Sequence, residues 1–524
     1  MKTIVIIFSV YLLSLLTVPA SNDSLIKFSD LPTKNNAEKQ TLKNYQEKGN
    51  KADIIDLFLT HYSNAENYSS AKAHELIMNC VSDLTNETND QDEAKKVKTI
   101  YKQVHKRFFK VYKLTNSFSD VFEKGEYNCV SGSALYAIIF HLMGIPYQIV
   151  EAPQHVFLFA YPNTHKIAIE TTLPQKGYFT FNEGYVEKFV NYLYESKLIT
   201  KEEYESESKN QLFEKYYFET KGLSIQELAA IQYSNYMAYY LENNENEKAL
   251  DEIKKAYYIH PSERNKYLLQ SSLGYCLSNH NYKEANDIRN LTILCRINNC
   301  NSKEVSNESI KYEFGRLTQE QLITNSSFDE YTRSFNSVYS CVTDSSLKSD
   351  ISFHYHYEMA RLNGANTKVD VRVVEYLKAA YREKPKHADL RNMIKSYFAR
   401  GIENENSITI ILERMDSFST AFGFLTGDPQ FNSIKANLLL EMAYQRFTLK
   451  DAGKGEQYLH TFELLCATDE NIKPGERFVE QAYSAAAAYY YKKGNSIKTR
   501  QILKAGLKHA PENFGLQLRL NQAK

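Results

Sequence analysis

Residues 125–172 read GEYNCVSGSALYAIIFHLMGIPYQIVEAPQHVFLFAYPNTHKIAIETT, and the rest of the chain is interpreted from this stretch. After Cys129, apolar residues recur at the spacing of a helix that is buried on most of its circumference. Gly144 and Pro146 end that helix in the usual order, because glycine accepts left-handed backbone and proline cannot continue a helix. The residues that follow are rich in β-branched and aromatic side chains and predict three short strands, 147–150, 156–161 and 166–172.

Three side chains of this stretch, Cys129, His155 and Glu170, could form a catalytic site. Cys129 lies where the helix begins, and the unpaired N–H groups and dipole of a helix N-terminus favour a thiolate. His155 opens the second strand, so its ring can face the helix start and accept the thiol proton. Strand faces alternate with period two, so any register that sets His155 opposite an even-numbered residue puts Glu170 on the same face. A carboxylate there can hold the imidazole in one tautomer.

The order of these motifs resembles the transglutaminase-like superfamily of papain-related folds. Gly-x-x-Asn-Cys precedes a buried helix that ends in Gly-Ile-Pro, a strand opens on His, and a later strand closes on Glu-Thr-Thr. The resemblance covers about residues 80–190 and implies a cysteine nucleophile, a histidine base and an acidic orienting group, at Cys129, His155 and Glu170.

The sequence also departs from the family pattern. The acidic residue is Glu where Asp is usual, and the aromatic residue that often follows the nucleophile is replaced by Val130. For the oxyanion, the backbone N–H of Cys129 is the minimal candidate donor, and the side chain of Asn128 is a weaker one.

The chain is too long for one ordinary core, so several domains are expected over its 524 residues. Residues 1–20 resemble a cleaved signal peptide, because Lys2 precedes an apolar run and small residues close it at Ala20. The protein is therefore expected to be exported, periplasmic or secreted. The further predicted segments are a polar lead-in at 21–50, a transglutaminase-like α+β domain at 51–200 and a helical repeat domain at 220–524.

The repeat domain is predicted from a recurring pattern of large and small residues. Counted back from Pro261, these residues follow the offsets of a helix-turn-helix unit of about 34 residues, which resembles the tetratricopeptide repeat (TPR). The pattern recurs before Pro511 and more weakly before Pro385. The predicted fold class is thus a papain/transglutaminase-like α+β domain followed by an all-α TPR-like solenoid, whose repeats would recruit a protein or peptide.

Composition limits the partners. Lys and Arg number 63, as do Asp and Glu, so nothing favours electrostatic binding of nucleic acid. After the N-terminal run no segment is apolar enough to span a membrane, so no stable membrane insertion is expected. No cofactor or metal is expected, since Cys295 and Cys300 lack the further ligands of a zinc site. The six cysteines other than Cys129 could be buried thiols or disulfides, and their spacing does not decide between the two.

These observations predict an exported thiol-dependent enzyme, a cysteine protease or a transglutaminase-like acyl transferase, that acts on peptide or isopeptide bonds through a Cys-His-Glu triad. The alternative is a protein-binding scaffold whose transglutaminase-like domain is catalytically inactive.

Overall fold

The computed structural model describes residues 25–49, 53–59, 70–152, 155–172, 177–179, 181, 183–218, 222–299, 305–364 and 370–523. The predicted signal peptide and Cys300 lie outside these residues. The chain divides into two compact units, Met1–Cys341 and Val342–Lys524. The boundary predicted between residues 200 and 220 therefore falls inside the first unit.

The predicted fold class is wrong. The structure is 74% helical, and its strands form one two-stranded parallel sheet and one four-stranded antiparallel sheet, both small. The helices after residue 224 do not begin a separate solenoid, because those up to Cys341 belong to the same compact unit as both sheets. The prediction failed because local patterns show where helices and strands occur but not which of them share a core.

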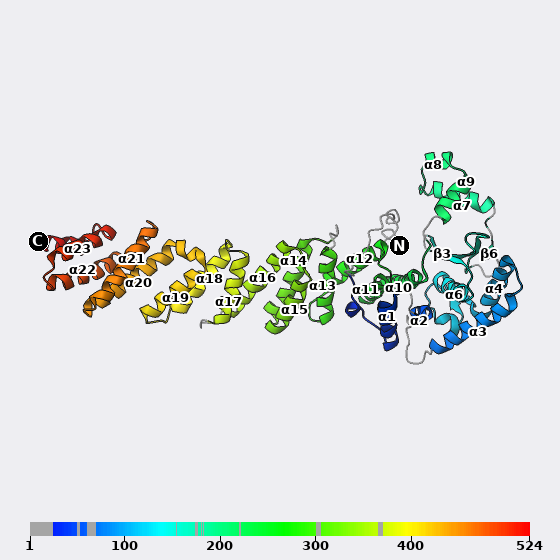
Figure 1. Cartoon of the computed structure of the whole chain (residues 1–524), viewed down its shortest axis with the longest axis horizontal. Coiled ribbons are helices and arrows are strands. Elements are labelled where there is room, and N and C mark those ends of the chain that lie inside the picture. Colours follow the sequence, from blue (N-terminus) through cyan, green and yellow to red (C-terminus); the bar gives the residue numbers. More distant parts are fainter. Residues whose placement is uncertain are drawn as a thin grey trace. The chain divides into compact units, whose positions relative to one another are not determined.

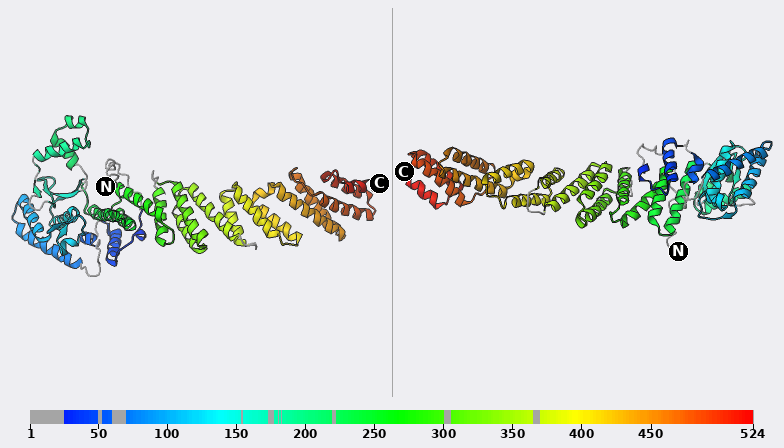
Figure 2. Two further views of the ribbon diagram at one scale, coloured as in Figure 1. Left: turned by 180° about the vertical axis from the view of Figure 1, so that it is seen from behind. Right: turned by 90° about the horizontal axis from the view of Figure 1, so that it is seen from below.

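The first part of the first unit contains both sheets (Figures 1 and 2). Its elements are the 3-10 helix η2 (Phe28–Asp30), α1 (Asn36–Lys48), α2 (Ile54–Leu59), α3 (Ser70–Thr88), α4 (Glu93–Phe108), β1 (Val111–Tyr112), α5 (Asp120–Glu123), β2 (Glu126–Tyr127), α6 (Cys129–Leu142), β3 (Tyr147–Ala152), β4 (His155–Ala160), β5 (Ile167–Ile169) and β6 (Tyr178–Phe179). The segment 115–126, which leads to Cys129, contains a short helix and the start of a strand.

The four-stranded sheet has the order β3-β4-β5-β6, with antiparallel neighbours throughout. Strands β4 and β5 pair Leu158 with Ile169 and Ala160 with Ile167, on either side of the turn at 162–165. Aromatic side chains of this sheet form a buried cluster with residues that follow it, comprising Val150, Phe157, Phe159, Ala168, Phe179, Phe181 and Tyr217.

Helix α6 packs against β3 and β4, and almost all of its side chains are buried. This burial agrees with an apolar pattern that runs around most of the helix. The helix ends as expected, since Gly144 has a positive φ of 67° and no side chain that would strain this conformation.

Over its described residues, the rest of the first unit is formed by helices, apart from an isolated β-bridge between Leu223 and Ile149. The helices are α7 (Glu183–Glu195), α8 (Lys201–Ser206), α9 (Lys209–Phe213), the π-helix η4 (Glu214–Phe218), α10 (Ile225–Glu242), α11 (Asn246–Ile259), α12 (Glu263–Asn279), α13 (Ala285–Asn299), α14 (Asn307–Leu317), the π-helix η5 (Thr318–Thr324) and α15 (Phe328–Cys341). The predicted repeat ending at Pro261 corresponds to the helix pair α10 and α11.

Ion pairs tie the polar lead-in to later helices over its described residues. Asp30 pairs with Arg296 of α13 at 2.5 Å, and Glu38 of α1 pairs with Lys255 of α11 at 2.8 Å. Glu38 and Lys255 are both almost completely buried. Asp30 and Glu38 therefore serve as buried partners for α13 and α11, which explains how a polar sequence can be ordered.

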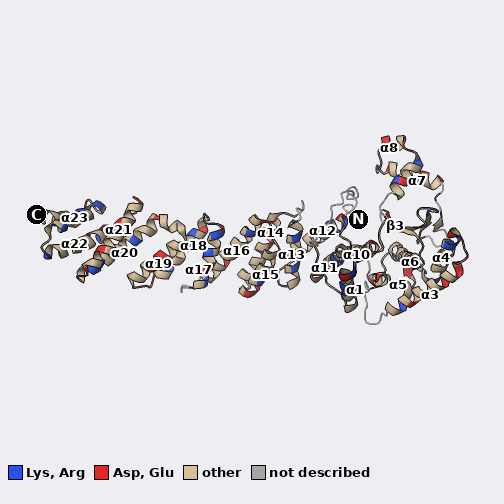
Figure 3. Cartoon of the chain, in the orientation of Figure 1, with Lys and Arg blue, Asp and Glu red and all other residues tan. Residues whose placement is uncertain are grey.

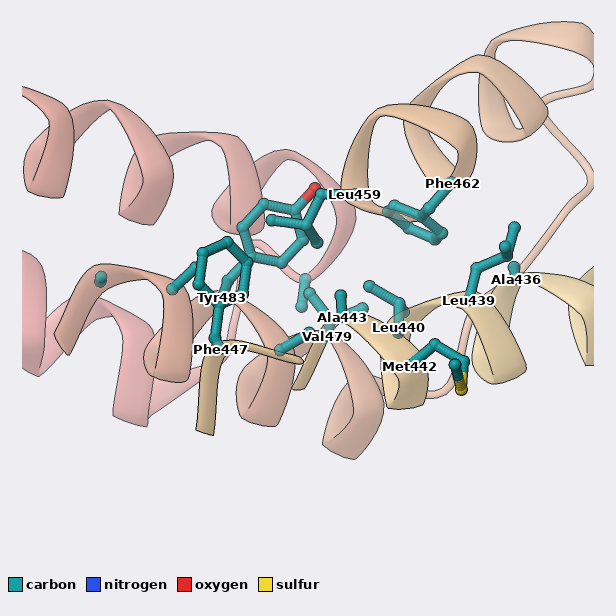
Figure 4. Packing of buried hydrophobic residues seen from close by; sticks show 14 of the residues in the cluster. Ala436, Leu439, Leu440, Met442, Ala443, Phe447, Leu459, Phe462, Val479 and Tyr483 are labelled. Atoms are coloured by element: carbon teal, nitrogen blue, oxygen red, sulfur yellow. The ribbon is translucent and has the colours of Figure 1, made fainter. Parts of the chain in front are cut away.

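The second unit is entirely helical among its described residues. It comprises α16 (Ser345–Asn363), α17 (Val371–Glu383), α18 (Ala388–Ile402), α19 (Ile408–Ala421), the 3-10 helix η6 (Gly423–Gly427), α20 (Pro429–Thr448), α21 (Ala452–Thr468), α22 (Glu476–Lys492), α23 (Ser496–His509) and α24 (Phe514–Gln522). Figure 4 shows side chains of α20, α21 and α22, among them Phe447, Leu459 and Tyr483, gathered between these helices. The unit thus has its own core.

Acidic and basic residues are interspersed along the helices, as the red and blue segments in Figure 3 show. This distribution fits the equal numbers of positive and negative residues. Among the helices that the structure describes, none combines the length and the apolar character needed to cross a membrane.

Candidate active site

Cys129 is the first residue of α6, and a capping box fixes the helix start around it. The Asn128 side-chain oxygen accepts the N–H groups of Val130 and Ser131, both at 2.9 Å. Ser131 Oγ accepts the N–H of Asn128 at 2.9 Å. Such a cap satisfies first-turn donors that have no partner within the helix, and it sets the direction in which the helix leaves the loop.

Asn128 is occupied at both ends of its amide. Its oxygen caps α6, and its nitrogen donates to the Leu114 carbonyl at 2.9 Å. Its side chain therefore positions the helix start, and this geometry gives no support to the predicted oxyanion role. Among the described residues, no hydrogen-bond partner is found for the N–H of Cys129 itself, which leaves this group as the donor beside the thiol.

His155 is the first residue of β4, and the backbone beside it is tied to α6. Ser133 of α6 donates its hydroxyl to the carbonyl of Val156 at 3.2 Å. This bond holds the start of β4 against the first turns of the helix. The His155 side chain is 30% exposed, so the ring lies at the surface end of the buried strand and remains open to a reaction partner.

Glu170 lies on the face that the alternation of strand residues predicts. Extended beyond Ile169, the β4–β5 register sets His155 opposite Thr172, so Glu170 shares the face of His155. The Glu170 carboxylate oxygen Oε2 lies 2.5 Å from His155 Nε2. The other oxygen, Oε1, accepts the N–H of Thr172 at 3.0 Å and its hydroxyl at 2.6 Å. Both oxygens are thus engaged, which fixes the orientation of the carboxylate.

The three predicted residues come together. A hydrogen bond with Cys129 is the largest effect on the pKa of His155, and a bond with Glu170 is the second; together they raise this pKa to about 10 against the opposing effect of burial. Because Nε2 faces Glu170, Nδ1 is the ring nitrogen left for the thiol. Burial alone would raise the pKa of Glu170, but the hydrogen bonds from His155 and Thr172 outweigh it and lower this pKa.

This electrostatic arrangement favours one protonation pattern. At neutral pH the imidazole is protonated and the Glu170 carboxylate is ionised. A positive imidazolium beside a sulfur atom stabilises the thiolate, which is the nucleophilic form of cysteine. The site can therefore supply an activated nucleophile together with a proton donor.

A buried polar network behind the site was not predicted. The Tyr101 hydroxyl of α4 donates to the Glu170 carbonyl at 3.3 Å, and His105 Nε2 lies 3.2 Å from the Thr171 carbonyl. The other His105 nitrogen contacts the Tyr136 hydroxyl at 2.8 Å. Burial lowers the pKa of His105, so its ring is neutral and donates one N–H. The only sequence signal was the helical spacing of Tyr101 and His105.

The remaining cysteines differ from Cys129. The six cysteines within the described residues are all free thiols, so no disulfide is found there. Burial raises the pKa of Cys276 to about 12 and that of Cys466 to about 11. It also raises the pKa of Cys80 and Cys295. These four thiols are therefore held in the neutral, unreactive form.

One group of side chains has a spacing suitable for a metal. Asp53, Asp56 and His74 each place a ligand atom within 4.8 Å of the others. Asp53 Oδ1, however, accepts the N–H groups at the start of α2, and Asp56 pairs with His74 at 3.0 Å. A helix cap and an ion pair account for this arrangement without a metal.

A hollow of about 450 Å³ lies among α12, α13 and α14. Its lining includes Tyr267, Gln270, Gly274, Tyr312 and Glu313. None of the three candidate catalytic residues lines it, so it is a separate feature of the helical part of the first unit.

No protein-family model matches the chain, and no curated protein was found that matches it.

Proposed function

We propose that the protein is a thiol-dependent acyl-transfer enzyme that cleaves amide bonds of peptides or isopeptides. The observation that carries the proposal is that the His155 imidazole makes hydrogen bonds with both the Cys129 thiol and the Glu170 carboxylate. Cys129 is the nucleophile, His155 the acid and base, and Glu170 the group that orients the imidazole.

The reaction follows from these positions. The Cys129 thiolate attacks the carbonyl carbon of the amide, and the negative charge moves to the carbonyl oxygen. The N–H of Cys129 is the donor we assign to that oxygen. His155 then gives its proton to the leaving nitrogen, the C–N bond breaks, and a thioester remains on Cys129. Water or an amine attacks the thioester while His155 removes a proton, and the thiolate leaves.

The setting we propose is outside the cytoplasm, because the apolar run before Ala20 has the pattern of a signal peptide. The substrate class is a peptide or protein. The hollow among α12, α13 and α14 supports the alternative function, a binding protein without turnover.

Alkylation of Cys129 by iodoacetamide, followed by peptide mapping at a series of pH values, separates the two functions. For the enzyme we expect alkylation to remain fast at mildly acidic pH, and the His155→Ala variant to require alkaline pH. Cys466 in the same molecule is the internal control, since burial raises its pKa to about 11. If the wild type and His155→Ala give the same profile, the enzyme proposal fails and the binding function remains.

A further inference from the structure

Strand β1 exposes an unusual group of apolar side chains. Val111 is 56% exposed, Tyr112 46% and Leu114 77%. These three side chains, which we call the β1 ledge, belong to four consecutive residues. The fourth residue, Lys113, pairs with Glu126 at 2.9 Å, so its charge is balanced within the site region. Successive side chains of a strand point to opposite faces, so Tyr112 and Leu114 share one face, and an exposed apolar pair of this kind is typical of a binding surface.

The backbone of β1 offers hydrogen-bonding groups at the edge away from β2. The N–H of Val111 bonds the Gly125 carbonyl at 3.1 Å, and the N–H of Lys113 bonds the Tyr127 carbonyl at 2.8 Å. Backbone groups alternate in direction along a strand, so the N–H and C=O of Tyr112 point away from β2. No other strand among the described residues pairs with β1. Tyr112 therefore presents one donor and one acceptor at an open edge.

The ledge contacts the residues that directly precede the nucleophile. Tyr112 pairs with Tyr127, two residues before Cys129, and their rings are 5.8 Å apart. The Leu114 carbonyl accepts the Asn128 amide that caps α6. Partial burial raises the pKa of Tyr112, and the charges of Cys129 and Glu170 raise it further.

We propose that an extended peptide substrate adds to β1 as a further strand, bonds the backbone of Tyr112, and places apolar side chains on the β1 ledge. This inference rests on the proposed function, because the peptide must reach the Cys129 thiol. Strand addition gives affinity through main-chain bonds and selectivity through side-chain contacts. The preferred substrates are therefore extended peptides with aliphatic or aromatic residues close to the cleaved amide.

The position of the ledge indicates the substrate as its occupant. Strand β1 pairs with β2, and Cys129 follows β2 by two residues, so a chain bound at the outer edge of β1 lies one strand away from the segment that carries the thiol. A second copy of this protein could pair with the same edge, but it would cover the approach to Cys129. Dimer formation through β1 is accordingly the competing outcome in the test.

The test uses tripeptide probes that carry a thiol-reactive acyloxymethyl ketone, and it measures the second-order rate of Cys129 labelling in the full chain. A Leu/Phe probe is compared with a Ser/Glu probe and with an N-methylated Leu/Phe probe. Tyr112→Ala removes the side chain, whereas Tyr112→Pro also removes the outward N–H and spares the bonds made by Val111 and Lys113. Tyr192→Ala, at a residue 52% exposed on α7, is the matched control.

We expect the Leu/Phe probe to label the wild type at least about tenfold faster than the N-methylated probe, since each lost main-chain bond weakens docking. The Leu/Phe probe should label Tyr112→Pro more slowly than Tyr112→Ala by a similar factor. In Leu114→Ser, the ratio of the labelling rates of the Leu/Phe and Ser/Glu probes should fall. Tyr192→Ala should label like the wild type. Alkylation by iodoacetamide, which needs no docking, should change little in the β1 variants.

Three results would overturn the inference. Equal labelling by all probes, with iodoacetamide alkylation still dependent on His155, would reject the ledge and leave the proposed function intact. Iodoacetamide alkylation that ignores His155 would reject the proposed function, and the inference with it. A dimer in light scattering that Tyr112→Pro dissociates would assign the edge to a second copy.

Discussion

At the scale of single residues, the site depends on the contact between His155 and Glu170. The carboxylate is fixed by Thr172 on one oxygen and faces the imidazole with the other. Cys129 and Glu170 stabilise the charged form of the imidazole, and this stabilisation raises the pKa of His155 to about 10. Each shift in pKa is also a contribution to stability.

The Glu170→Gln variant tests this coupling. The amide keeps the shape of the carboxylate but loses its charge, so we expect the pKa of His155 to fall, measured from the imidazole proton signals in an NMR titration. A histidine with a raised folded pKa stabilises the protein fully below its unfolded value of about 6.5. That stability is lost as the pH rises through about 10. The advantage of wild type over variant in free energy of unfolding should shrink over this range.

At the scale of elements, the site depends on how closely α6 approaches the end of β5. A Cβ atom added at Gly132 would lie 2.9 Å from the Thr171 Cβ. The carbonyls of Glu170 and Thr171 are in turn held by Tyr101 and His105 of α4. The glycine thus permits the short distance between helix and strand that brings Glu170 to His155.

Gly132→Ala should separate these elements. We expect a loss of about 1–3 kcal/mol in the stability of α6, the usual cost of overpacking a filled core. Hydrogen exchange of the α6 amides measures this loss. Gly274→Ala in α12 is the control, because no atom lies within 4 Å of the added carbon, and alanine there should be neutral or gain up to about 1 kcal/mol. Equal effects of the two variants would contradict the close-approach explanation.

At the scale of the whole molecule, each compact unit has its own buried clusters. The sheet and the helices that follow it provide clusters in the first unit, and α20 to α23 contribute to one in the second. In the second unit, Gly506 of α23 faces Tyr483 of α22, where an added Cβ would lie 2.9 Å from the side chain. Small residues at this contact allow the two helices to pack closely.

Gly506→Ala should therefore loosen the second unit. We expect faster hydrogen exchange in α22 and α23, corresponding to about 1–3 kcal/mol, because the added methyl overpacks the contact with Tyr483. Protection of β3 and β4 should not change, since they belong to the other unit. Gly453→Ala in α21 meets open space and serves as the control. Unchanged exchange in α22 would show that the helices can move apart without cost.

Part of the site could be predicted from local sequence because its geometry is local. The helix that begins at Cys129, the strands that follow it and the shared face of His155 and Glu170 depend on periodicity over a few residues. Strands β1 and β2 have two residues each, too few to show any period, and they were missed. Tyr101 and His105 were missed as site residues because their contacts cross to residues far along the chain.

The sequence by itself thus determined which residues could form the candidate triad and on which face of the strand Glu170 lies, because chain geometry links neighbours directly. Only the tertiary structure decided the fold class, the ordered N-terminal segment and the open edge of β1. Glu38 resembles any exposed glutamate until Lys255 of α11 is found against it. Burial and long-range pairing depend on which elements pack together, and no local pattern records that choice.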